Sequence, residues 1–324
     1  MAALNHRARP RGVAQATPGG PGPTWHTRPM HDDDDAPAPR VEEIAPPFEG
    51  GAHLRAMAAA LPAACGVYVF HGEGDEDALP LYIGKSVNLR SRVQAHLRNP
   101  EEARMLQMAR RISHQRTAGE LGALLLEAQL VKRRQPLFNR KLRRTRQLCA
   151  IRLREGEAPQ VVHTGDVDFA ADPHLHGLFP SRRAAVERLH DLADAHRLCL
   201  GLLGLERLAG ARGCFRAALR RCAGACRGDE PRAAHDARLR AALDAMRLRV
   251  WPHAGTIGLI ERDPAEGRTD IHVVRDWCHL GTVADLAAAR RLARVPTVYD
   301  GDLYRLLCGP VLEARLPWVA IDGP

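Results

Sequence analysis

The sequence predicts an α+β protein with small antiparallel sheets flanked by helices, and three observations support this class. Segments 65–71 and 79–84 are short, rich in Val, Tyr, Phe and Leu, and bounded by turn residues, as strands are. Apolar residues recur at helical spacing from Leu121 to Val131, before Pro136 ends the pattern. A separate group of apolar strands and helices follows residue 255, and 324 residues are enough for two or three domains.

The composition favours nucleic acid as the partner and argues against a membrane. A formal net charge of +9 attracts anionic partners, and the basic residues lie among the folded motifs and not in a lipidated tail. No apolar run approaches the roughly 18 residues that a membrane-spanning helix needs. We therefore expect a DNA-binding protein with no membrane association.

The N-terminal residues 1–46 are rich in Pro, Gly, Arg and Ala and contain four consecutive Asp. A segment of this composition buries too little apolar surface to fold, so we expect a disordered leader. The leader has no apolar stretch typical of a secretory signal, and the expected location is the cytoplasm, in association with the nucleoid. A short helix over 53–61 is expected to follow.

The chemistry is concentrated between residues 66 and 139. Two strands, Gly66-Val67-Tyr68 onward and Tyr82-Ile83-Gly84-Lys85, can form a hairpin that brings their tyrosines together if the register places both on one face. In the helix that follows, Asn88, Arg92 and His96 recur every four residues and so share one face. The sequence thus predicts a polar, basic surface beside a pair of tyrosines.

A second helix carries one carboxylate within an apolar run. Its predicted start is the capping box 117–120, Thr-Ala-Gly-Glu, and it ends before Pro136. Glu127 lies among its apolar residues, where a carboxylate without a partner is costly to bury. A divalent cation would supply that partner. Eight Lys or Arg residues then fall between positions 132 and 146.

These motifs in this order resemble the GIY-YIG nuclease family. The resemblance implies a metal-dependent endonuclease, a phosphodiester hydrolase whose catalytic residues are Tyr68, Tyr82, Lys85, Arg92, His96, Glu127 and Asn139.

The family's roles carry over by position. Glu127 would hold one Mg²⁺ or Mn²⁺, and either Tyr68 or Tyr82 would orient or deprotonate the attacking water. Arg92 would stabilise the pentavalent phosphate, and Asn139 would close the site. These roles match what an in-line attack on a phosphodiester requires, namely an activated water and neutralisation of the growing charge.

A tyrosine that acts as a base needs a neighbouring cation, because the pKa of a free tyrosine is about 10. Lys85 lies three residues after Tyr82 and is expected to supply that charge. The surrounding residues are expected to hold DNA phosphates without reading bases. The predicted DNA-binding residues are Asn88, Arg90, Arg98, Lys132, Arg133, Arg134, Arg140 and Lys141.

Beyond the basic run, residues 148–153 and 160–163 are predicted strands, and a loop leads to the segment 177–180, Gly-Leu-Phe-Pro. Ser181 is predicted to cap a helix that runs to about Arg197.

Four cysteines follow: Cys199, Cys214, Cys222 and Cys226. The last two are four residues apart, one helical turn, so their thiols can face a common point. In a cytoplasmic protein such a group indicates a metal site more than a pair of disulfides. Zinc sites usually show Cys-x2-Cys pairs, which are absent here, and the spacing fits an iron–sulfur cluster at least as well. An iron–sulfur cluster, zinc and no metal at all therefore remain as alternatives.

The segment 177–226 resembles the region after the nuclease domain of UvrC, the bacterial excision-repair endonuclease, where a four-cysteine box is associated with a [4Fe–4S] cluster. We find neither a second nuclease domain nor helix-hairpin-helix motifs after residue 227, so the layout resembles the short, Cho-type members of this family. The resemblance implies a single nick on the 3′ side of a lesion in double-stranded DNA. It also implies UvrB, loaded by UvrA, as the partner, and no nucleotide cofactor bound by the chain itself.

The remaining residues predict a small α+β module whose role the sequence does not assign. Strands are expected over 256–260, 270–274 and 278–283, after a helix that ends near Val250. The expected organisation is a leader 1–46, a nuclease domain 50–146, a UvrC-like linker region 147–198, a cysteine segment 199–227 and an α+β module 228–324.

Two other functions are compatible with parts of the sequence. One is a different GIY-YIG enzyme, a structure-specific or mobile-element nuclease, although the cysteine segment counts against it. The other is a non-catalytic DNA-binding adaptor or redox sensor built around the four cysteines. It would require the nuclease residues to be vestigial, whereas the complete set is present.

Overall fold

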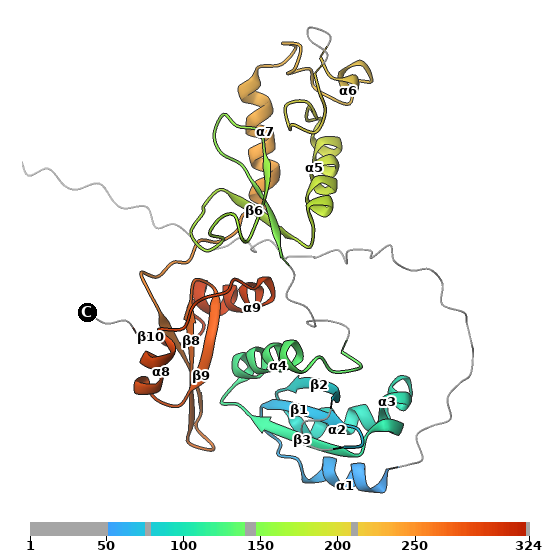
Figure 1. Ribbon diagram of the computed structural model, residues 1–324, viewed down its shortest axis with the longest axis vertical. Helices are drawn as coiled ribbons and strands as arrows, with labels where there is room; N and C mark the ends of the chain where they lie inside the picture. The colour runs from blue at the N-terminus through green and yellow to red at the C-terminus, as the bar shows by residue number, and fades with distance from the viewer. Residues whose placement is uncertain (1–50, 75–78, 140–146, 209–212, 322–324) are drawn as a thin grey trace, which may run out of the picture. The chain divides into compact units, whose positions relative to one another are not determined.

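The computed structural model describes residues 51–74, 79–139, 147–208 and 213–321 of the chain. The predicted leader, residues 1–46, lies outside these ranges. Within them, three antiparallel sheets and their flanking helices confirm the α+β class (Figure 1). No helix in the described ranges is both long and apolar enough to cross a membrane.

The first sheet contains the predicted hairpin and one more strand. Its order is β2-β1-β3, with all neighbours antiparallel. The strands are β1 (Gly66–His71), β2 (Pro80–Ser86) and β3 (Arg111–Arg116). Every residue of β1 is buried, as expected for the central strand. The sequence analysis did not predict β3, because Ile112 is the only strongly apolar residue in its Arg-Ile-Ser-His-Gln-Arg sequence.

Helices cover both faces of this sheet. Successive side chains of a strand point to opposite faces, so β1 presents Tyr68 and Phe70 to one core and Val67 and Val69 to another. The first face packs against α1 (Ala52–Ala60), α2 (Leu89–Arg98) and α3 (Ala103–Met108), with the 3-10 turn η1 (Pro100–Glu102) between the last two. The second face packs against α4 (Glu120–Arg134) (Figure 1).

The middle part of the chain forms a second sheet in the order β5-β4-β6. Its elements are β4 (Cys149–Arg152), β5 (Gln160–His163), β6 (Leu175–Phe179), α5 (Arg182–His196), the short α6 (Phe215–Ala218) and α7 (Arg232–Asp244). The Ser181 hydroxyl accepts a hydrogen bond from the Ala184 N–H, which confirms the predicted cap of α5. Leu239 and Leu243 of α7 join the core of β4 and α5, so α7 packs with this middle part, although the sequence grouped it with the C-terminal module.

The C-terminal part contains a four-stranded sheet in the order β10-β7-β8-β9. Its elements are β7 (Ile257–Asp263), β8 (Arg268–Arg275), β9 (Cys278–Val283), α8 (Leu286–Leu292), α9 (Gly301–Leu312) and β10 (Trp318–Ala320). The first three strands were predicted from their apolar residues. The short β10 was not, because its pairing with β7 depends on a contact between residues some sixty positions apart, such as Val319 with Gly258.

Helix α4 contributes to two cores at once. Leu126, Leu130 and Val131 pack on β1 and β2. Leu121 and Leu125 instead join a core that includes residues of β4, β7 and α9. The helix therefore connects the first sheet to the C-terminal sheet through its own side chains.

The predicted capping box of α4 is wrong. The helix begins at Glu120 with Gly119 as its N-cap, and no side chain of the N-cap residue bonds to it. The Thr117 hydroxyl donates instead to the Gly119 carbonyl oxygen, at 2.8 Å. The N-terminal N–H groups of α4 have acceptors from elsewhere in the fold, as described below.

Leu125 offers a direct test of the core that α4 shares with the C-terminal sheet. Its side chain is fully buried, so we expect Leu125→Ala to lower the free energy of unfolding by about 2–5 kcal/mol through lost burial and the cavity left behind. Equilibrium denaturation in urea measures this loss. Gln129→Ala, on an exposed position of the same helix, is the control and should change stability by less than about 0.5 kcal/mol. Equal effects of the two variants would contradict the shared core.

Candidate active site and cysteine site

The two tyrosines lie together because of a glycine between them. In the hairpin, Tyr68 is paired with Gly84, and Phe70 is paired with Tyr82. A Cβ atom at Gly84 would lie 2.4 Å from the Tyr68 hydroxyl oxygen and 2.8 Å from the Tyr82 ring, so only glycine lets the Tyr68 phenol cross β2. The ring centroids of Tyr68 and Tyr82 are 6.2 Å apart, so the tyrosines lie close together, as expected from the predicted hairpin.

A buried hydrogen-bonded chain begins at the Tyr68 hydroxyl. The hydroxyl is 2.5 Å from His96 Nε2, and His96 Nδ1 bonds to the Glu102 carboxylate in η1. Tyr68 and His96 are almost fully buried. Burial lowers the pKa of His96, while Glu102 acts in the opposite direction. A neutral His96 that donates from Nδ1 to Glu102 can therefore accept the Tyr68 proton at Nε2.

Sequence reasoning missed Glu102. The residue lies six positions after His96, beyond the end of α2, so helical spacing does not connect the two side chains. Asn99 caps η1, and Pro100 begins this turn; together they bring Glu102 back toward His96. The Asn-Pro-Glu-Glu sequence after a helix is a turn signal, but nothing in it indicates which side chain the carboxylate meets.

The cation beside the tyrosines is Arg92, where the sequence predicted Lys85. Burial raises the pKa of both Tyr68 and Tyr82, and the Arg92 charge opposes that shift in each. Lys85 Nζ donates instead to Glu120 Oε1 at 2.6 Å. Lys85 follows Gly84 in the strand and so points to the opposite face, toward α4.

Glu127 lies on α4, facing the hairpin. Its Oε1 accepts a hydrogen bond from the Lys85 backbone N–H at 3.1 Å. Burial raises its pKa, and the Lys85 N–H, the Lys85 charge and the Arg92 charge oppose that shift. A half-buried carboxylate whose charged form is disfavoured fits a divalent cation, because Mg²⁺ is bound by one or two carboxylates together with waters and substrate phosphates.

Asn139 acts on the backbone of β2. Its Oδ1 accepts from the Ile83 N–H at 2.9 Å, and its Nδ2 donates to the Ile83 carbonyl oxygen at 2.8 Å. The preceding Leu137 and Phe138 N–H groups donate to Pro80 and Leu81. The irregular segment 137–139 thus binds the outer edge of β2, the strand that carries Tyr82.

Four of the predicted DNA-binding residues, Asn88, Arg90, Lys132 and Arg134, interact with other residues of the protein. The Asn88 side chain accepts from the Ser91 N–H as the N-cap of α2, and Arg90 Nε donates to the Leu61 carbonyl oxygen. Lys132 forms ion pairs with Asp300 and Asp302 at the start of α9.

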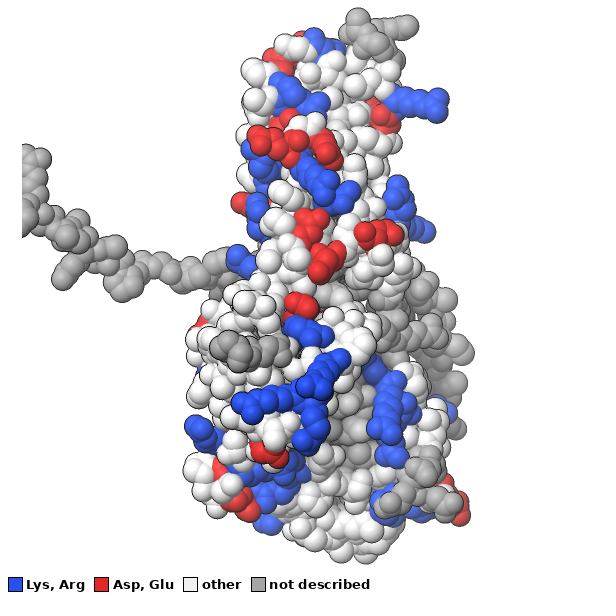
Figure 2. All heavy atoms as spheres, turned by 60° about the vertical axis from the view of Figure 1, so that its left-hand side comes forward, with Lys and Arg blue, Asp and Glu red and all other residues white. Residues whose placement is uncertain are grey.

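Burial divides the predicted DNA-binding residues differently. Arg90, Arg98 and Arg133 are exposed, whereas Lys132 and Arg134 are partly buried. Arg140 and Lys141 lie outside the described ranges. Lys and Arg side chains gather in groups on the face drawn in Figure 2, with acidic side chains between them.

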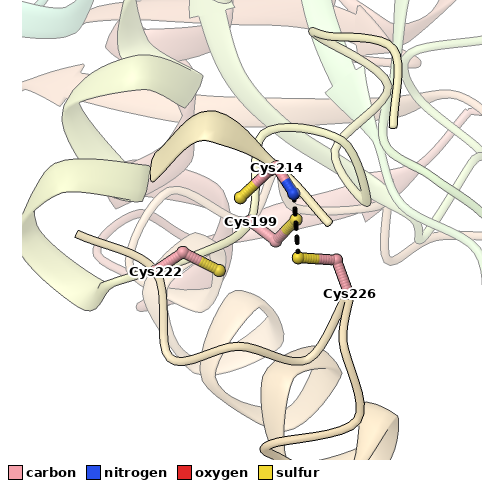
Figure 3. Close-up of side chains that lie close together, drawn as sticks. All are labelled: Cys199, Cys214, Cys222 and Cys226. Atoms are coloured by element: carbon pink, nitrogen blue, oxygen red, sulfur yellow. Dashed lines mark hydrogen bonds between the residues drawn. The ribbon is translucent and has the colours of Figure 1, made fainter. Parts of the chain in front are cut away.

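The four predicted cysteines converge on one point. Their sulfur atoms all lie within 4.8 Å of one another (Figure 3). The prediction that Cys222 and Cys226 share a helical turn is wrong. The chain between them is an irregular turn that includes Gly224 at φ 90°, a conformation that glycine adopts readily.

Hydrogen bonds within this group favour one thiolate. Burial opposes ionisation of Cys226, but hydrogen bonds from the Cys214 N–H and from the other three thiols lower its pKa overall. The Cys214 N–H lies 3.3 Å from Cys226 Sγ (Figure 3). Burial raises the pKa of Cys199 to about 11. Four converging sulfurs with one ready to ionise suit a thiophilic metal, which binds thiolates.

Three family models match consecutive parts of the chain. Residues 64–140 match the UvrC-like GIY-YIG domain. Residues 148–245 match the middle domain of UvrC/Cho excinuclease, and residues 256–324 match the C-terminal domain of excinuclease Cho.

Whole-chain relatives agree with these matches. Excinuclease Cho of Escherichia coli O157:H7 is 50% identical over 286 residues, which cover 88% of this chain and 95% of the relative. Excinuclease Cho of Salmonella typhi is 52% identical, covering 86% and 94%. Among solved structures, the magnesium-bound N-terminal endonuclease domain of UvrC from Thermotoga maritima is 31% identical, covering 28% of this chain and 99% of that domain, with a TM-score of 0.25. The chain belongs to the Cho excinuclease family, the short UvrC-like enzymes with a GIY-YIG nuclease domain.

Proposed function

We propose that this chain cuts one phosphodiester on the 3′ side of a lesion in double-stranded DNA during nucleotide excision repair, on DNA that UvrA has loaded with UvrB. The observation that carries the proposal is the convergence of Tyr68, His96, Arg92 and Glu127 around one hairpin, in a chain that belongs to an excinuclease family.

The buried chain from Tyr68 to Glu102 provides a path for the proton of the attacking water. Tyr68 takes a proton from the water while its own hydroxyl proton passes to His96 Nε2. The Glu102 carboxylate then stabilises the imidazolium that results. The hydroxide attacks phosphorus in line, the bond to the leaving oxygen breaks, and that oxygen takes a proton from a solvent water. Because burial raises the pKa of Tyr68, a free tyrosinate is disfavoured, so transfer through His96 is the route that the geometry supports.

Positive charge from Arg92 on one side of the hairpin, and from a cation that Glu127 would hold on the other, would stabilise the negative charge of the phosphate. Arg92 is exposed next to Tyr68, so its guanidinium can bind the phosphate oxygens in the transition state, when their charge grows. Glu127 would hold a divalent cation, which supplies positive charge near the leaving oxygen. Lys85 is ion-paired with Glu120 and so adds a polar contact between β2 and α4, which pack through their apolar side chains.

Exposed basic residues would hold the DNA. Arg98 and Arg133 suit contacts to phosphates, which carry no sequence information and weaken steeply with salt. Lys132 is better assigned to the contact between α4 and α9 than to DNA, because both carboxylates that it meets are at least partly buried. Sequence-independent binding of this kind leaves recognition of the lesion to UvrB.

Glu127→Gln tests the metal-dependent chemistry. The amide retains an acceptor for the Lys85 N–H but loses the negative charge, so we expect nicking to fall at least a hundredfold while the fold is retained. The measurement uses a duplex with one bulky lesion, UvrA, UvrB, ATP and Mg²⁺. Glu101→Gln, at an exposed position of η1, is the control and should nick normally. Nicking that needs neither lesion nor UvrB would overturn the repair assignment, and a Glu127→Gln variant that nicks normally would overturn the role of Glu127.

Glu102→Gln tests the proton path through pH dependence. His96 must be neutral to accept a proton, so the nicking rate should fall as pH drops through its pKa. Glu102 raises that pKa, and its neutralisation should move the acidic limb of the pH–rate profile to lower pH. The maximal rate should also fall, by about tenfold or more, because general acid–base steps contribute about 10²–10⁴. A variant with the wild-type rate and acidic limb would exclude the path.

The cysteine site is proposed to hold a metal centre. We expect metal to copurify with the chain under anaerobic conditions and Cys222→Ser to lower the metal content per chain. Iron with acid-labile sulfide and visible absorption would identify a cluster, and zinc alone would identify a single tetrahedral ion. Cys149→Ser, a buried cysteine outside the group, is the control and should keep the metal. A wild-type chain without bound metal would contradict the proposal.

A further inference from the structure

The helix that carries Glu127 receives its N-terminal cap from the C-terminal sheet. Gly119, the N-cap residue of α4, has no side chain to accept hydrogen bonds. The Glu261 carboxylate of β7 takes that place, because Oε1 accepts from the Leu121 N–H at 3.0 Å and Oε2 accepts from the Gly122 N–H at 2.7 Å. These two N–H groups are the ones that an N-cap side chain normally binds.

Two further residues of β8 support this cap. Asp270 Oδ2 accepts from the Ala118 N–H, just before the helix, at 2.7 Å. His272 Nε2 lies 3.0 Å from Glu261 Oε2, and its Nδ1 lies 2.8 Å from the Thr282 hydroxyl of β9. All three side chains of the β7–β8 pair are buried. The positive end of α4 therefore faces a fixed, buried cluster of polar side chains.

Glu261 is charged in this setting. Burial opposes its ionisation, but the hydrogen bonds from His272, Gly122 and Leu121 lower its pKa overall. A carboxylate at a helix N-terminus also gains from the helix dipole. Removing such a group leaves N–H donors without acceptors in a buried place, which is costly.

Two glycines at the start of α4 leave room for the Glu261 carboxylate of β7. A Cβ atom at Gly119 would lie 2.4 Å from Glu261 Oε1. A Cβ atom at Gly122 would lie 3.0 Å from the His272 ring and 3.2 Å from Glu261 Oε2. Neither glycine is in the left-handed region, so space and not backbone conformation explains them.

The capped turn is connected directly to the proposed metal ligand. Gly122 and Glu127 are five residues apart on one helix, about 7.5 Å along its axis. The first residue of the helix, Glu120, binds Lys85 Nζ, and Glu127 binds the Lys85 N–H. Fraying or rotation of the first turn would therefore move Glu127 relative to β2 and the tyrosines.

We propose that the C-terminal module positions the catalytic helix, with Glu261 as the N-terminal cap of α4 that holds Glu127 in place. This gives a function to a part of the chain to which the sequence assigned none. The inference rests on the proposed role of Glu127 in metal binding. Glu261 is a positioning residue, because its carboxylate contacts only protein groups and no reacting atom.

Glu261→Ala and a rescue variant test the cap. The single substitution should speed amide hydrogen exchange at Leu121 and Gly122. It should also raise the Mg²⁺ concentration for half-maximal nicking about fivefold, because the loss of an N-cap typically costs about 1 kcal/mol and that free energy corresponds to a fivefold change in an equilibrium constant. Adding Gly119→Asp should reverse both effects. The Glu261→Ala change frees the space at Gly119, whose extended backbone (φ −165°, ψ −171°) suits an Asp N-cap. Rescue by a cap within α4 itself would not follow if Glu261 merely stabilised the C-terminal module.

Asp263→Asn is the matched control. Asp263 also lies on β7 and contacts the first sheet, but its partner is Arg116 of β3 and not α4. The Asp263→Asn substitution should leave unchanged both the amide hydrogen exchange at Leu121 and Gly122 and the Mg²⁺ concentration for half-maximal nicking. Unchanged exchange in Glu261→Ala would overturn the cap, and faster exchange with an unchanged Mg²⁺ requirement would overturn the positioning role. If the wild type did not nick at all, the proposed function would fail, and hydrogen exchange would still decide the cap.

Discussion

The structure depends on α4 being buried on two opposite sides. One side packs on β1 and β2, and the other packs on a core that includes residues of β4, β7 and α9. A helix in this position is held by burial along most of its circumference, and its polar groups must find partners inside the protein. Glu127, the N–H groups of its first turn and Lys132 are the groups concerned. Each has a partner from a different part of the chain.

These partners show how a buried helix can also carry Glu127, the carboxylate that we propose as the metal ligand. At its N-terminus Glu261 accepts two hydrogen bonds, and near its C-terminus Lys132 is ion-paired with Asp300 and Asp302. Between these two anchors, Glu127 faces the hairpin with one hydrogen bond from β2. Buried polar contacts can specify one arrangement of a helix without adding much stability. We propose that here they fix the distance from Glu127 to the two tyrosines.

The hairpin contributes the other half of the site through close packing. Gly84 allows the Tyr68 phenol to cross β2, and that places the hydroxyl next to His96. Asn139 binds the outer edge of β2 and prevents the strand from shifting. The backbone of β2 therefore supports Tyr68 and Tyr82, the side chains that we propose to react. Such preorganisation is what electrostatic stabilisation of a phosphoryl transition state requires.

The sequence by itself determined the elements that have local signals and the residues that lie in the family's motifs. Short apolar segments predicted β1, β2, β4, β5, β7, β8 and β9, and the Ser181 cap predicted α5. The four cysteines indicated one site from their number and context, and the structure brings them together. The tertiary structure decided the features that depend on distant contacts. Polar β3 is a strand because it pairs with β1, and Glu102 meets His96 through the turn η1. The first turn of α4 is capped by Glu261, 139 residues beyond Gly122, and not by the predicted capping box at residues 117–120. Local propensity could not reveal that cap, because a carboxylate from another strand satisfies the helix only after both have folded together.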